Sequence, residues 1–111
     1  MRVVKVTGRY RFIDDGFLRY VASHIEYDAF VKDVGKRLIK GDIFTGCFAM
    51  KHKYFIEFLN QLDRQKMEEE MSCIEWELAD YVALCREMKT CFMERLGMAY
   101  HFSCYNRDSY I

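Results

Sequence analysis

The chain has 111 residues, of which 51% are hydrophobic and 16% aromatic, with no proline and no net charge. This length and composition predict one folded domain, residues 1–111, and exclude a disordered or fibrous protein. Because no apolar run approaches the roughly 18 residues that cross a bilayer, we also expect no membrane association.

The N-terminal half shows three successive patterns. Residues 3–13 alternate between apolar and polar side chains, which is the period of a strand with one face on a core. Gly8 interrupts this run and predicts either a bulge or the turn of a short hairpin at Thr7–Gly8. Residues 17–40 change to helical spacing and predict a helix, and residues 42–50, short and β-branched, predict a second strand.

The C-terminal half carries two helical stripes of apolar residues. One covers residues 52–66, and the other, with alternating steps of three and four, extends to Gly97. Since glycine commonly ends a helix, we expect a long amphipathic helix over about 72–96. A weak alternation predicts a third strand over 98–106, followed by a loose terminus over 107–111.

Three consecutive glutamates, residues 68–70, lie between the two stripes. The residues from 63 to 71 favour helix, which would give one continuous rod. Against this, Ser72 and Glu75 match a capping box, and the stripes would face directions about 135° apart on one straight helix. We therefore predict a break or sharp kink near residues 67–71.

Together these patterns predict an α+β domain, with about three short strands packed against three or four helices. The spacing over 72–96 is also typical of a coiled coil, so we expect a homodimer; the alternative is that this stripe packs on the chain's own sheet. The five cysteines form no CxxC pair, and charge comes too early for a signal peptide. Free thiols and a cytoplasmic location are the simplest interpretation.

Candidate metal ligands occur as two pairs, Cys47 with His52 and His101 with Cys104. Their spacing matches no zinc motif, and buried thiols beside ordinary histidines are the interpretation that we prefer. His24 and Asp28 are candidates for a general-base pair, although a surface pair on a helix is simpler. Because the chain also lacks a glycine-rich phosphate loop, we expect a non-enzymatic protein without a cofactor.

Basic and aromatic residues alternate in two places, a pattern typical of surfaces that bind single-stranded nucleic acid. The candidates are Lys5, Arg9, Tyr10, Arg11, Lys51, Lys53 and Tyr54. The first 55 residues carry 11 Lys or Arg and 6 Asp or Glu, which supports a basic face. However, the alternation that exposes Arg9 and Arg11 would bury Tyr10, and the net charge of zero also disfavours this interpretation.

Acidic residues gather around the single tryptophan and support the interpretation that we favour. The candidates for partner binding are Glu68, Glu69, Glu70, Trp76, Glu77 and Asp80. An exposed tryptophan with an acidic rim is a good anchor for a protein partner, the alternative being a solvated acidic face. We expect an interaction protein of the accessory or inhibitory type that phages and mobile elements encode. A nucleic-acid binder is the alternative, and a small metal-dependent or hydrolytic protein is the third possibility.

Overall fold

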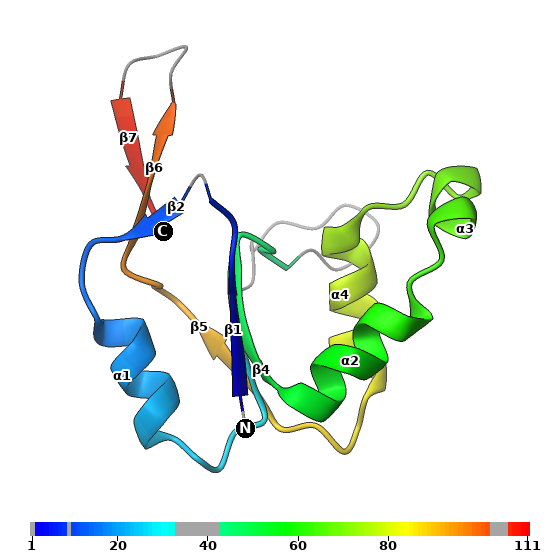
Figure 1. Cartoon of the computed structure of the whole chain (residues 1–111), viewed down its shortest axis with the longest axis horizontal. Helices are drawn as coiled ribbons and strands as arrows, with labels where there is room; N and C mark the ends of the chain where they lie inside the picture. The colour runs from blue at the N-terminus through cyan, green and yellow to red at the C-terminus, as the bar shows by residue number, and fades with distance from the viewer. Residues whose placement is uncertain (1, 9, 33–42, 103–106) are drawn as a thin grey trace.

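The structure is a computed structural model that describes residues 2–8, 10–32, 43–102 and 107–111, with the backbone alone for 100–102 and 107–109. The described elements, in chain order, are β1 (Arg2–Val6), β2 (Tyr10–Phe12), α1 (Gly16–Ser23), β3 (Ala29–Lys32), β4 (Cys47–Lys51), α2 (His52–Gln61), α3 (Arg64–Glu69), α4 (Ile74–Leu84), β5 (Thr90–Met93), β6 (Met98–Phe102) and β7 (Arg107–Tyr110) (Figure 1).

Within these ranges the strands form two sheets. The larger sheet has the order β1-β4-β3-β5, in which β4 is antiparallel to both neighbours and β5 is parallel to β3. The smaller sheet has the order β2-β6-β7 and is antiparallel. The chain does turn at Thr7 and Gly8, but β1 and β2 belong to different sheets, so the turn predicted there joins two sheets and forms no hairpin.

The larger sheet is buried on both faces, because its central strands place apolar side chains alternately to either side. One face packs against α2 and α4, using Ala29, Val31, Phe48 and Met50. The other packs against α1 and the smaller sheet, using Phe30, Cys47 and Ala49. Figure 1 shows this layering, with α1, β2, β6 and β7 on one side of β1 and the three later helices on the other. The mixed helix and sheet content agrees with the predicted α+β class.

The predicted break near residues 67–71 is confirmed, because α3 ends at Glu69 and α4 begins at Ile74. Met71 adopts the left-handed conformation, with a φ of 54°. The Ser72 N–H donates to the Met67 carbonyl at 2.8 Å, and the Met71 N–H donates to the Glu68 carbonyl at 3.3 Å. These two bonds are those of a Schellman motif, which satisfies the last carbonyls of α3 and turns the chain toward α4.

The predicted capping box does not form, and the N-cap lies one residue after the predicted Ser72. Cys73 is the N-cap of α4, and no side chain caps this helix. The Ser72 hydroxyl instead donates to Glu77 Oε1 at 2.7 Å. A further break, absent from our prediction, separates α2 from α3, where the Asp63 carboxylate accepts from the Lys66 N–H at 3.1 Å and caps α3.

The predicted long helix over 72–96 is wrong, because α4 ends at Leu84 and β5 occupies Thr90–Met93. Cys91 and Met93, two residues apart, pack in the same core as Phe30, as alternate residues of a strand do. The run from Met88 to Met93 therefore fits a strand as well as the helical spacing that continues through it. Pairing with β3 decides between the two periods. The stripe of α4 packs in the core of its own chain, which removes the basis for a coiled-coil pairing through this helix.

Two other predicted elements need correction. The helix predicted over 17–40 ends at Ser23, and β3 follows, since its apolar residues fill both faces of the sheet; residues 33–40 lie outside the described ranges. The terminus predicted to be loose forms β7, which pairs with β6. No helix within the described ranges is long and apolar enough to cross a membrane.

Candidate partner-binding groove

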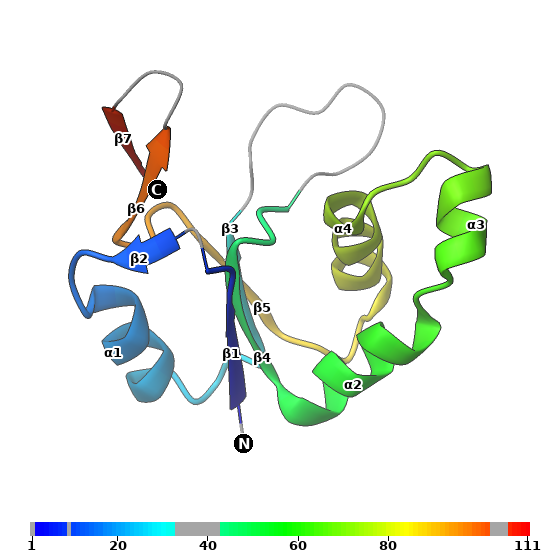
Figure 2. The same ribbon diagram turned by 45° about the horizontal axis from the view of Figure 1, so that its top comes forward.

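A groove of about 430 Å³ opens between α2, α3 and α4. Its lining residues are Glu57, Phe58, Gln61, Leu62, Lys66, Glu77, Asp80, Tyr81, Leu84 and Cys85. Figure 2 shows the three helices following one another around this region. The lining combines apolar side chains with three carboxylates and one ammonium group, so the groove is both hydrophobic and acidic.

The packing of α2 against α4 forms the floor of the groove. The rings of Phe58 and Tyr81 lie 5.5 Å apart between centroids and are inclined at 49°. The Tyr81 hydroxyl donates to Glu57 Oε1 at 3.0 Å. Burial and this hydrogen bond both raise the pKa of Tyr81, so the hydroxyl stays protonated and acts as a donor that orients the Glu57 carboxylate.

Leu84 gives the groove an exposed apolar edge. It ends α4, and 80% of its surface is accessible. A single exposed leucine is common on protein surfaces, but this one adjoins an apolar floor formed in part by Phe58 and Leu62. A ligand that covered Leu84 would therefore extend a hydrophobic surface that is already partly formed.

The predicted acidic residues divide between the groove and its surroundings. Glu77 and Asp80 line the groove, whereas Glu68, Glu69 and Glu70 are exposed on α3 and at its end. Trp76 is half-buried and lies outside the lining, so it is not the exposed anchor that we expected. Glu57 was missed because only the packing of α2 on α4 brings it beside Asp80, and Leu84 was missed although it follows Asp80 by one turn of α4.

The predicted basic and aromatic residues do not form one surface of free cations and rings. Lys5 Nζ donates to Thr7 Oγ1 at 2.8 Å and to the Thr45 carbonyl. Lys51 pairs with Asp28, and Lys53 is exposed above the ring of Tyr54, which is itself buried. Tyr10 is half-buried, with its ring edge-on to that of Phe44. Arg11 is exposed, and Arg9 lies outside the described residues. A buried ring cannot stack on a base, which weakens the nucleic-acid interpretation.

The proposed metal ligands are separated where they are described. Cys47 is fully buried at the start of β4, and His52 is exposed just after its end. Burial raises the pKa of the Cys47 thiol to about 11, so the thiolate that a metal requires is disfavoured. The side chain of His101 and all of Cys104 lie outside the described residues. Among the residues that the structure does describe, no three candidate ligands come together.

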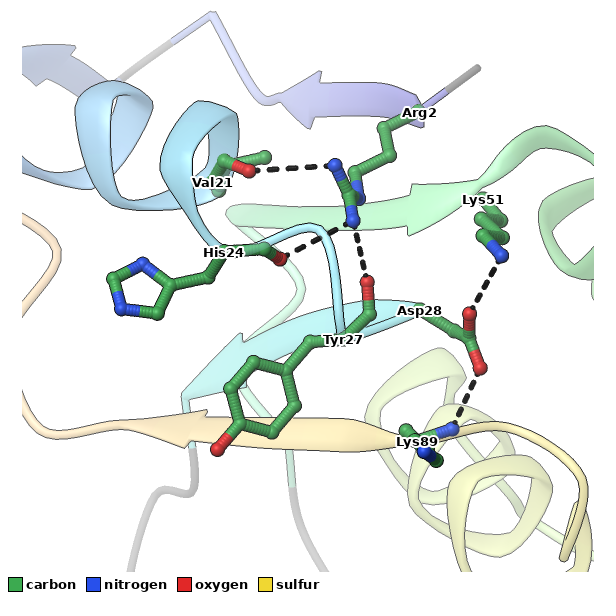
Figure 3. Close-up of polar contacts among 7 residues, drawn as sticks. All are labelled: Arg2, Val21, His24, Tyr27, Asp28, Lys51 and Lys89. Carbon is green, nitrogen blue, oxygen red and sulfur yellow. Dashed lines mark hydrogen bonds and ion pairs between the residues drawn. The ribbon is translucent and has the colours of Figure 1, made fainter.

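His24 and Asp28 do not form the predicted pair, because α1 ends at Ser23. The His24 ring stacks on Tyr20, with centroids 3.7 Å apart. Asp28 is 9% exposed; Oδ1 pairs with Lys51 Nζ at 2.9 Å, and Oδ2 accepts from the Lys89 N–H at 2.8 Å (Figure 3). Burial raises the pKa of Asp28, but these two partners outweigh it and leave the pKa below its ordinary value. The carboxylate is therefore a structural link between strands.

No protein-family model, curated protein or solved structure matches this chain.

Proposed function

We propose that the protein is a non-enzymatic interaction protein that binds a protein partner through the groove between α2, α3 and α4. The bound segment is a basic amphipathic helix. The observation that carries this proposal is the combination of an exposed Leu84 with three carboxylates around one apolar floor. Grooves of this kind accept the apolar face of a helix, which presents side chains at steps of three and four residues.

The negative charge of the groove favours a partner with positive charge. Among the described residues that line the groove, the carboxylates of Glu57, Glu77 and Asp80 outnumber the Lys66 ammonium group, and the glutamates at 68–70 are exposed. The partner helix therefore carries Lys or Arg beside its apolar face, which speeds association and excludes acidic competitors. Because such attraction acts between partly exposed charges, added salt weakens the complex.

The biological role that we propose is binding without catalysis. His24 and Asp28 are engaged in separate contacts, His24 with Tyr20 and Asp28 with Lys51 and Lys89. We assign the protein to the accessory or inhibitory type that phages and mobile elements encode. Free thiols support a reducing, cytoplasmic location, and these are Cys47, Cys73, Cys85 and Cys91.

A designed peptide tests the groove. The probe is a helical Lys/Leu peptide with leucines at positions i, i+3, i+4 and i+7, and fluorescence anisotropy measures its affinity. Two control peptides separate specific from non-specific binding: one scrambles the same composition, and the other replaces Lys by Glu. We expect wild-type protein to bind the amphipathic Lys/Leu peptide more tightly than either control.

Variants locate the binding. Leu84→Arg removes apolar contact worth roughly 1.5–3 kcal/mol when buried, so affinity should fall at least tenfold. Asp80→Asn should weaken binding less and flatten its dependence on salt. Met71→Arg is the matched control, since Met71 is 85% exposed and lies outside the groove. Equal affinities for wild type, Leu84→Arg and Met71→Arg would show that the groove is not the binding site.

A further inference from the structure

β1 lies at an edge of the larger sheet, since it pairs with β4 and with no other described strand. In an antiparallel ladder, pairs that exchange hydrogen bonds alternate with pairs that do not. The Thr7 N–H donates to the Gly46 carbonyl at 2.8 Å, in register with the β1–β4 ladder. The alternation therefore directs the backbone N–H and C=O groups of Arg2, Val4 and Val6 away from β4, toward the open edge.

Within the described ranges, this edge shows none of three common protections. Edge strands are normally shielded by outward charges, proline or a bulge. β1 carries two cations, but the Arg2 guanidinium donates to three carbonyls in α1 and the loop that follows it (Figure 3), and Lys5 Nζ donates to Thr7 and Thr45. The chain has no proline, and the pairing from Arg2 to Val6 contains no bulge.

Apolar side chains flank the edge on the α1 side. A groove of about 480 Å³ lies between α1 and β1, lined by Arg2, Val4, Leu18, Val21, Ala22, Ile25 and Lys51. Leu18 is 40% exposed and Ile25 is 77% exposed. Figure 1 shows β1 in front of the larger sheet, with α1 to its left and α2 to its right. An added strand beside β1 would therefore cover backbone groups and apolar side chains together.

The cations near this edge are already bonded within their own chain, which favours an added strand of low charge. Arg2 and Lys5 are hydrogen-bonded within their own chain, and Lys51 is paired with Asp28 at 2.9 Å. An acidic strand would thus find no outward cation among these three residues, so the edge fits a valine-rich strand of low charge. The sequence of β1 itself, RVVKV, is such a strand once its two cations are folded back.

We propose that β1 pairs antiparallel with β1 of a second copy of this chain, with Val4 on the two-fold axis. In this register Arg2 faces the second copy's Val6 and Lys5 faces the second copy's Val3, so no like charges are opposite each other. The outward backbone groups of Val4 bond across the axis to the same groups of the second copy. The larger sheet then runs through both copies, and α1 lies beside α1 of the second copy.

Val4→Pro tests this pairing without breaking the β1–β4 ladder. Proline removes the outward N–H of Val4, and proline is tolerated on an edge strand where its nitrogen faces outward. Val4→Ala is the control, because it also loses the branched valine side chain but keeps the N–H. Sedimentation and native mass spectrometry should find wild type and Val4→Ala at twice 13.4 kDa. The dimer dissociation constant of Val4→Pro should rise at least about tenfold.

Leu18→Arg keeps the proposal testable if Val4→Pro fails to fold, because it places two arginines beside the axis through an exposed side chain. Its dimer should also dissociate, whereas Leu84→Arg, in the other groove, should remain a dimer. A wild-type monomer at every concentration would overturn the proposal. Dimers of unchanged stability in both Val4→Pro and Leu18→Arg would overturn it as well.

Discussion

Asp28 holds three strands of the larger sheet together, and its removal should destabilise the protein measurably. Its carboxylate joins Lys51, at the end of β4, to the Lys89 N–H, just before β5. Its backbone repeats the link, because the Asp28 carbonyl accepts from the Lys51 N–H at 2.8 Å and the Asp28 N–H donates to the Lys89 carbonyl at 2.7 Å. Asp28→Ala removes only the side-chain half of this arrangement.

The expected cost follows from the exposure of each contact. A hydrogen bond to a charged acceptor contributes roughly 1.5–3 kcal/mol, and Asp28→Ala also leaves the Lys89 N–H without this acceptor. The Lys51 side chain is 43% exposed, so its ion pair adds less than about 1 kcal/mol. We expect Asp28→Ala to lower the free energy of unfolding by about 2–4 kcal/mol. Asp28→Asn keeps a neutral acceptor and should cost about half as much.

The effect should depend on pH in one direction. Burial raises the pKa of Asp28, but the Lys89 N–H and Lys51 outweigh it, so the folded pKa lies below the ordinary 3.8. The carboxylate therefore contributes its full stabilisation above about pH 3.8 and loses it as the pH falls through the lower, folded value. The difference between wild type and Asp28→Asn should shrink over that acidic range.

Urea unfolding at a fixed protein concentration, followed by the fluorescence of Trp76, measures these differences. Asp15→Asn serves as the control, since Asp15 is an exposed carboxylate paired with an exposed Arg19 and should change stability by less than about 0.5 kcal/mol. The reasoning fails if Asp28→Ala matches this control at neutral pH. It also fails if the gap between wild type and Asp28→Asn widens as the pH falls.

Two further predictions concern the helix break and the buried thiol. Met71→Gly should raise the free energy of unfolding by about 0.5–1 kcal/mol, because Met71 is exposed and has the positive φ that glycine adopts without strain. Met71→Ala should not raise it. If urea unfolding showed the same gain for Met71→Ala as for Met71→Gly, the conformational explanation would be refuted. Cys47 should resist alkylation in the native protein, because it is buried and its thiol has a pKa of about 11. Peptide mapping should find it modified only after unfolding, and rapid labelling of native Cys47 would contradict the burial.

Local sequence patterns predict the fold only where a single period applies. The β-branched and aromatic run that contains β4 has no competing helical pattern, and the opposed stripes around residues 67–71 require a break. The run from Met88 to Met93 fits both periods, since the helical spacing continues through it while Cys91 and Met93 alternate as in a strand. Its strand conformation depends on β3, whose position in space no local pattern contains.

The candidate groove is predictable to a similar extent. Asp80 and Glu77 are found from the acidic composition of α4, because both lie on the same helix. Glu57 joins them only through the packing of Phe58 on Tyr81 and the hydrogen bond from the Tyr81 hydroxyl. Trp76 illustrates the opposite case: its distance from the apolar stripe suggests exposure, but in the folded chain it is half-buried.

The parallel pairing of β3 with β5 also constrains the order of folding. Asp28 and Lys89 are 61 residues apart in the chain, whereas β4 follows β3 closely and α2 begins immediately after β4. Closing such a long loop is costly before its contacts form, so topologies of this kind fold slowly. During synthesis, β3 would wait with one side unpaired until residue 93 had left the ribosome. The interval before β5 docks is therefore when the nascent chain is most exposed to strand-mediated aggregation.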